Sequence, residues 1–139
     1  MSDSIRILLA DDHPVVREGL GALLLPRNGT VVVGEAGNGR EAVEMARALK
    51  PDVVLMDLVM PEMDGIQATR EITRDDPAIR ILILTSFSDE GRLATALQAG
   101  ASGFLLKDFK PDDLLHAIRA VHWGPLAVPP DMARRLRAL

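Results

Sequence analysis

The chain contains no cysteine among its 139 residues. Disulfide bonds, catalytic thiols and zinc or iron–sulfur sites with cysteine ligands are therefore excluded, and the composition fits a reducing compartment. No apolar run approaches the roughly 18 residues that a membrane helix needs. The run Ile5–Ala10 is too short for an export signal and has acidic residues on both sides. These absences predict a cytoplasmic protein with no membrane segment.

Positive charge is also scarce, since the formal net charge is −4 and the pI is about 5.3. Affinity for nucleic acid comes mostly from cations that neutralise phosphates, so these residues are expected to bind nucleic acid poorly. The basic residues cluster at the C-terminus, where we interpret Arg134, Arg135 and Arg137 as the solvated face of a short helix. Any DNA-binding element is expected elsewhere.

The apolar residues form short runs that are typical of buried strands, and helical signals fall between them. The expected strands are Ile5–Ala10, Thr30–Val33, Val53–Met56, Ile79–Leu84 and Gly103–Leu106. The first expected helix runs from Pro14 to about Leu25, and the second begins at Asn38 with Glu41 as its capping-box partner. The third begins at Asp64, the fourth runs from Ser88 or Asp89 to Gly100, and the fifth begins at Pro111. Most of the strands lack the polar alternation of a half-exposed strand, which indicates a parallel sheet covered on both faces. The alternation predicts an α/β fold of about five βα units.

The composition changes after the fifth expected helix. Gly124, Pro125, Pro129 and Pro130 break regular structure, and Asp131 could cap a last short helix. We therefore predict a domain over residues 1–123, and a linker with a short helix over residues 124–139.

Four of the expected strands stop at polar residues of a kind that handles phosphate or a hard metal ion. These residues are Asp11-Asp12, Asp57, Thr85 and Lys107. In open α/β sheets ligands bind beyond the carboxyl ends of the strands, where residues far apart in sequence converge. The pattern therefore predicts one site.

The chemistry of such a site follows from its acids. Two carboxylates about 4 Å apart repel by roughly 4 kcal/mol at an effective dielectric of about 20, so Asp11, Asp12 and Asp57 together must take up protons or bind a cation. Oxygen ligands without histidine or cysteine favour Mg²⁺. Lys107 would then supply a point charge for a phosphoryl oxygen, Thr85 a hydroxyl donor, and one aspartate could attack phosphorus as a nucleophile.

These residues resemble the receiver domain of two-component response regulators. The matching motifs are Asp11-Asp12 after a first strand, the segment from Asp57 through Pro61 to Asp64-Gly65, Thr85 and Lys107, and the resemblance spans about residues 5–123. It implies a flavodoxin-like (βα)5 three-layer sandwich whose five-stranded parallel sheet has the order 2-1-3-4-5. That order places the three aspartates beside the switch point.

The resemblance also implies the role of each residue. Asp57 would accept phosphate from a histidine kinase, while Asp12, Asp57 and the Val59 backbone carbonyl hold Mg²⁺ and Asp11 acts through a metal-bound water. Thr85 and Phe104 would form the switch, in which the hydroxyl shifts toward the new phosphoryl group and the ring swings inward. Such a domain is not an enzyme beyond assisting its own Mg²⁺-dependent phosphorylation and dephosphorylation.

The segment from Thr85 to Glu90 and the tail from Gly124 look most like the NarL/FixJ branch of transcriptional regulators. Phosphorylation there implies homodimerisation, and promoter DNA would be bound by a LuxR-type helix-turn-helix domain that these residues do not include. The chain is either a piece of a longer regulator, which we favour, or a stand-alone receiver. Many receivers have a cis proline after the lysine, whereas this chain has Asp108, so the geometry of the Lys107–Asp108 bond stays open.

Three alternatives belong to other classes. The motif Gly37-x-Gly39-x-x-Ala42 follows a strand and opens a helix, as a dinucleotide-binding loop does, but it leaves the acids and Lys107 without a role, and Glu35 would repel a pyrophosphate. A phosphatase of the haloacid dehalogenase type needs a second aspartate two residues after the nucleophile, where this chain has Val59. A receiver-like module that docks partners without ever taking phosphate remains the main alternative.

Overall fold

The computed structural model describes residues 4–86 and 90–124. Its elements follow in the order β1 (Ile5–Ala10), α1 (Pro14–Leu23), the 3-10 turn η1 (Pro26–Asn28), β2 (Thr30–Ala36), α2 (Gly39–Leu49), β3 (Val53–Asp57), α3 (Gly65–Asp75), β4 (Arg80–Thr85), α4 (Glu90–Gln98), β5 (Gly103–Leu106) and α5 (Pro111–Trp123). The five strands form one parallel sheet in the order β2-β1-β3-β4-β5. The predicted fold and strand order are therefore confirmed.

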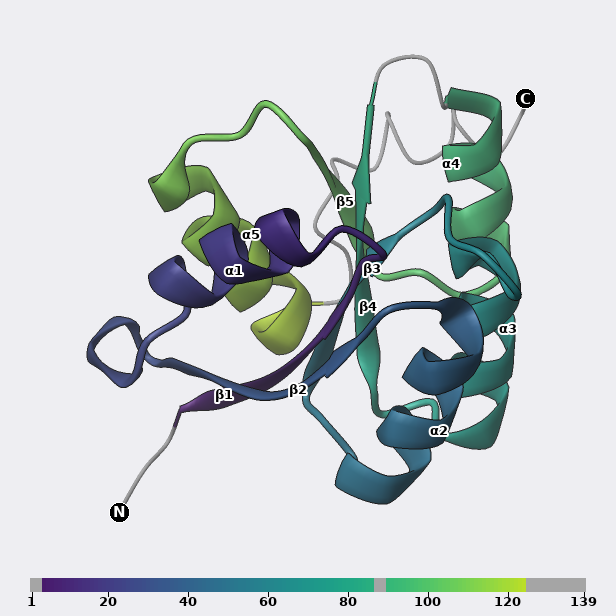
Figure 1. Ribbon diagram of the computed structural model, residues 1–139, viewed down its shortest axis with the longest axis horizontal. Coiled ribbons are helices and arrows are strands. Elements are labelled where there is room, and N and C mark those ends of the chain that lie inside the picture. The colour runs from purple at the N-terminus through teal and green to yellow at the C-terminus, as the bar shows by residue number, and fades with distance from the viewer. Residues whose placement is uncertain (1–3, 87–89, 125–139) are drawn as a thin grey trace.

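Helices cover both faces of the sheet and make three layers (Figure 1). Buried side chains of α2, α3 and α4 pack on one face, and those of α1 and α5 pack on the other. Strand β3 lies at the centre of the sheet with β1 beside it, and nearly all the side chains of these two strands are buried. This two-sided burial explains their continuous apolar sequences.

The predicted helix caps at Asn38 and Asp64 are present. The Asn38 side chain accepts a hydrogen bond from the Glu41 backbone N–H, and the Asp64 side chain accepts one from Gln67 N–H. Glu41, which was expected to complete a capping box with Asn38, instead accepts from the N–H of Gly37 at 2.7 Å. Both helices therefore begin where the sequence predicted. The one difference is that the Glu41 carboxylate accepts from the N–H of Gly37 and not from that of Asn38, as a capping box would require.

Several predicted boundaries were wrong. The first helix ends at Leu23 and not near Leu25, because Pro26–Asn28 forms a separate 3-10 turn. Strand β2 continues three residues past the expected end, through Glu35 to Ala36, because it pairs with β1 along its whole length. Helix α4 ends at Gln98 before Gly100, whose φ of +120° is left-handed.

The start of α4 at Ser88 or Asp89, and the linker with its short helix beyond Gly124, lie outside the described residues. Within the part of the chain that is described, no helix combines the length and apolarity required to cross a membrane.

Candidate functional site

The sheet brings the predicted polar residues to one edge. Asp11 and Asp12 directly follow β1, and Asp57 is the last residue of the adjacent strand β3. Thr85 ends β4 and pairs with Leu106, so Lys107 begins the loop beyond β5 next to it. The N–H of Lys107 donates to the Thr85 carbonyl at 2.8 Å. All five side chains therefore belong to the carboxyl edge of the sheet, as predicted.

The acidic side chains form a compact cluster. Asp11, Asp12, His13 and Asp57 each offer a ligand atom, and these atoms all lie within 4.8 Å of one another. Asp11 is 1% exposed and Asp57 is 2% exposed, so two of the three carboxylates are held away from water. Such a cluster is costly without a compensating cation.

One oxygen of Asp11 indicates where a cation would fit. Asp11 Oδ1 accepts from the His13 backbone N–H at 2.8 Å, and it lies 2.9 Å from His13 Nδ1. Asp11 Oδ2 is buried and has no hydrogen-bond partner among the described residues. Asp12 Oδ1 is also buried; it lies 3.1 Å from His13 Nδ1 but without the angles of a hydrogen bond. Unsatisfied carboxylate oxygens are the hard ligands that Mg²⁺ prefers, so this donor set fits that ion.

Asp57 faces Lys107. The Lys107 ammonium lies 3.1 Å from Asp57 Oδ1, and the N–H of Val59 approaches the same oxygen at 3.5 Å. Burial raises the pKa of Asp57 above its ordinary value, and the nearby Asp11 adds to that rise, while the hydrogen bond and charge of Lys107 oppose it. Lys107 is half-exposed and its long side chain can move, so it can follow an added group on Asp57.

The two predicted switch residues lie on neighbouring strands. Thr85 is 1% exposed, and its hydroxyl donates a long hydrogen bond of 3.4 Å to the Ser86 carbonyl. Phe104 on β5 is partly buried and packs against the cluster of buried side chains that includes α4. The Lys107–Asp108 bond is trans, because no cis peptide occurs in the described residues.

His13, predicted from the sequence to be a surface residue without partner spacing for a metal, does lie at the surface with a side chain that is 61% exposed, but its contacts with the acidic cluster were not predicted. His13 reaches back to Asp11 and Asp12, and these two carboxylates raise the pKa of its ring. Arg17, one turn later on α1, was also missed: its guanidinium donates to the Asp11 carbonyl and pairs with Glu35 at 3.1 Å. An aspartate accepting from the N–H two residues ahead is a common local motif, and it was the available signal for His13.

The glycine motif before α2 does not offer a phosphate cradle. The N–H of Gly37 is taken by the Glu41 carboxylate, and that of Gly39 donates to the Met63 carbonyl at 2.9 Å. A pyrophosphate would need such groups free. The dinucleotide-binding alternative therefore loses its structural basis.

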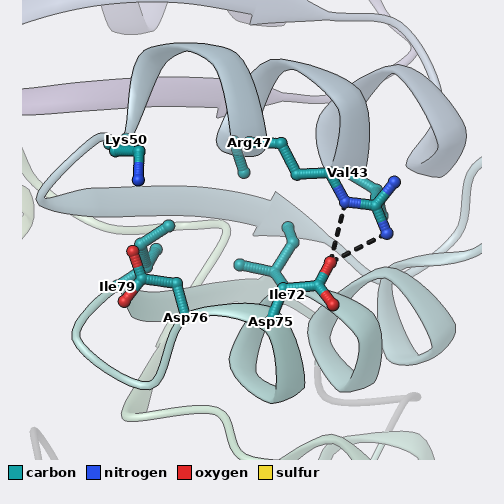
Figure 2. A pocket seen from close by; sticks show the side chains of 8 residues that line it. Val43, Arg47, Lys50, Ile72, Asp75, Asp76 and Ile79 are labelled. Atoms are coloured by element: carbon teal, nitrogen blue, oxygen red, sulfur yellow. Dashed lines mark hydrogen bonds and ion pairs between the residues drawn. The ribbon is translucent and has the colours of Figure 1, made fainter.

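A pocket of about 350 Å³ lies at the other end of the sheet, between the C-terminal turns of α2 and α3 (Figure 2). Its apolar floor includes Val43, Ile72 and Ile79, and Arg47 pairs with Asp75 at 2.8 Å across it. The two charges neutralise each other, so this pair contributes packing between the helices and no reactive group.

The strand order 2-1-3-4-5, with a carboxylate cluster facing a lysine at the carboxyl edge, defines a receiver module. The chain belongs to the response regulator receiver domain family, whose model matches residues 7–119.

The similar proteins include response regulators of the LuxR/NarL type. The chain is 43% identical over 132 residues to the transcriptional regulatory protein LnrK of Bacillus subtilis and 39% identical over 134 residues to the response regulator protein VraR of Staphylococcus aureus. The two alignments cover 95% and 96% of this chain, but only 60% of the length of LnrK and 64% of the length of VraR.

Solved structures of response regulators also resemble this chain. A LuxR-family response regulator from Aurantimonas sp. superposes with a TM-score of 0.84 at 43% identity, covering 97% of this chain and 96% of that one. The receiver domain of the putative response regulator NarL from Mycobacterium tuberculosis gives 0.82 at 36% identity, covering 88% and 98%.

Proposed function

We propose that this receiver domain takes a phosphoryl group on Asp57 from a sensor histidine kinase. The observation that supports this most directly is the pairing of a buried Asp57 carboxylate with the Lys107 ammonium at 3.1 Å, beside an acidic cluster with an unsatisfied Asp11 oxygen. A carboxylate oxygen of Asp57 attacks phosphorus, the bond from phosphorus to the kinase imidazole breaks, and the imidazole leaves with the electron pair. Lys107 balances the charge that the new phosphoryl oxygens bring.

Asp11, Asp12, Asp57 and the Val59 carbonyl would hold Mg²⁺. The ion, when bound, neutralises phosphoryl oxygens and orients them for in-line transfer. Asp11 would take part through a water molecule with its unpaired Oδ2, while His13 holds Oδ1 through its backbone N–H and ring. The domain performs no other catalysis in this proposal.

Phosphorylation then acts as a switch. Nearly two added negative charges on Asp57 attract the Thr85 hydroxyl, and Phe104 moves into the space that the hydroxyl leaves. We propose that the altered surface forms a homodimer in the cytoplasm. The dimer would present LuxR-type DNA-binding domains of a longer chain to promoter DNA.

The chemistry is tested by intact mass after incubation with acetyl phosphate, with and without Mg²⁺. Wild type should gain one phosphoryl group only with Mg²⁺, and Asp57→Ala should gain none. Asp75→Ala is the matched control. Asp75 is the last residue of α3, at the end of the helix away from Asp57, so this variant should still gain the phosphoryl group. A folded wild type without an adduct would instead favour the module that docks partners without phosphate.

The switch is tested with Lys107→Ala. This variant should keep its fold and lose dimerisation on phosphorylation, because the phosphoryl oxygens lose their cation. Light scattering after acetyl phosphate treatment measures the oligomer, and Lys110→Ala, at the exposed start of α5, is the matched control. Normal dimerisation of phosphorylated Lys107→Ala would remove Lys107 from the switch.

A further inference from the structure

The loop from Leu58 to Asp64 carries Val59, which is expected to contribute a backbone carbonyl to the cation. Two of its apolar side chains are buried, Leu58 at 2% and Met60 at 8% exposed. Its ends are closed by a hydrogen bond of 2.8 Å from Gly65 N–H to the Leu58 carbonyl. The direction of the Val59 carbonyl therefore depends on how the middle of this loop is held.

The middle of the loop has an unfavourable backbone. Glu62 has a φ of +64°, and the N–H of Met63 donates to the Pro61 carbonyl at 2.7 Å across it. A hydrogen bond between residues two apart, with positive φ at the central residue, is a rare and strained form of γ-turn. A glutamate adopts such a conformation only where surrounding contacts enforce it.

Those contacts come from the glycine motif before α2. Asn38 Nδ2 donates to Glu62 Oε2 at 2.8 Å, while Asn38 Oδ1 caps α2. The next residue, Gly39, donates its N–H to the Met63 carbonyl at 2.9 Å. A Cβ at Gly39 would lie 2.1 Å from that oxygen, so only glycine permits this approach.

We propose that Asn38 and Gly39 are positioning residues for the cation site. They hold the strained turn at Glu62 and thereby set the backbone of the loop that carries Val59. The glycine motif, which resembles a phosphate cradle in sequence, thus acts as a brace between the start of α2 and the loop after β3. This inference rests on the proposed Mg²⁺ site.

The test exchanges the partners of one hydrogen bond. Asn38→Asp keeps an oxygen to cap α2 but replaces the amide donor with a carboxylate that repels Glu62. The Mn²⁺ affinity of the intact protein, measured by electron paramagnetic resonance, should fall about 3- to 10-fold. Residues that hydrogen-bond to a metal ligand typically change metal affinity by about 10-fold or more, and Asn38 acts less directly than they do. The double variant Asn38→Asp/Glu62→Gln reverses donor and acceptor, and it should restore affinity to within about twofold of wild type.

Charge alone predicts the opposite sign, because an added carboxylate near a cation site should strengthen Mn²⁺ binding. Gln67→Glu, on the exposed face of α3, controls for this effect and should bind Mn²⁺ at least as well as wild type. Asn38→Ser, which keeps a capping oxygen and removes the amide, should weaken binding in the same direction as Asn38→Asp.

A second measurement, thermal melting in the absence of metal, tests the strain at Glu62. Glu62→Gly and Glu62→Ala both remove the carboxylate, but only glycine relaxes at positive φ, so Glu62→Gly should melt several degrees higher. Unchanged or tighter Mn²⁺ binding by Asn38→Asp, or failure of the double variant to recover, would overturn the positioning role. A wild type that binds no Mn²⁺ would overturn the proposed cation site and this role with it.

Discussion

Both ends of the sheet carry acidic and basic side chains, but their surroundings differ. At the carboxyl end the side chains of Asp11 and Asp57 are 2% and 4% exposed, and Asp11 Oδ2 has no hydrogen-bond partner in the described chain. At the amino end Asp75 is 32% exposed and is paired with Arg47, which is 55% exposed. Charges at the first end are held in an unfavourable state that a ligand could relieve, whereas Arg47 and Asp75 at the second end already compensate each other.

The largest expected effect comes from the backbone of the carboxyl end. A Cβ at Gly65 would lie 2.1 Å from the Asp57 carbonyl oxygen, so Gly65→Ala must displace the strand end that carries Asp57. We expect the free energy of unfolding to fall by about 2–4 kcal/mol. Gly21→Ala in α1 is the matched control: its Cβ meets nothing within 4 Å, and a gain of about 0.5–1 kcal/mol is expected.

Urea denaturation with equal slopes for all variants measures this difference. An equal, small change in both variants would show that Gly65 has room and that the Asp57 backbone is less confined than its contacts indicate.

The same substitution of aspartate by asparagine should change the free energy of unfolding in opposite directions at the two ends of the sheet. In EDTA at neutral pH, Asp57→Asn should raise the free energy of unfolding by about 1–2 kcal/mol, because it removes a desolvated charge beside Asp11. Asp75→Asn should lower it by about 0–1 kcal/mol, because it weakens an exposed ion pair.

The pH dependence follows from the raised pKa of Asp57. The wild-type contribution of this group is favourable below the pKa of the unfolded chain and is lost as pH rises through the folded pKa. The advantage of Asp57→Asn should therefore grow from acid to neutral pH. Thermal melts across that range measure it, and a destabilised Asp57→Asn at neutral pH would mean that the Lys107 pair outweighs burial.

Much of this architecture could be predicted from the sequence. Strands β1, β3 and β4 are buried on both faces, so their apolar runs are continuous, and polar residues at their carboxyl ends marked the site. The caps at Asn38 and Asp64 were predictable because they depend on local hydrogen bonds. The end of β2 was missed because Gly34 and Glu35 resemble a turn, and only pairing with β1 makes them extended.

Other features had no local signal. The positive φ of Glu62 depends on contacts with Asn38 and Gly39, more than twenty residues earlier in the chain. Arg17 reaches Asp11 and Glu35 only because α1 packs beside the ends of β1 and β2. These tertiary contacts shape the surroundings of the acidic cluster, and they cannot be read from the spacing of the acidic residues alone.

The smallest expected effect is the titration of His13, which reports the uncompensated charge at the carboxyl end directly. The hydrogen bond to Asp11, and then the charge of Asp12, raise the pKa of the ring above 6.5. Its pairing therefore favours the folded state below pH 6.5 and is lost as pH rises through the folded pKa. A nuclear magnetic resonance titration of the ring in EDTA should show this elevation, and Asp11→Asn should reduce it more than Asp12→Asn. Asp75→Asn, at the compensated end, should leave the titration unchanged, and a shift there would mean that the two ends are electrostatically coupled.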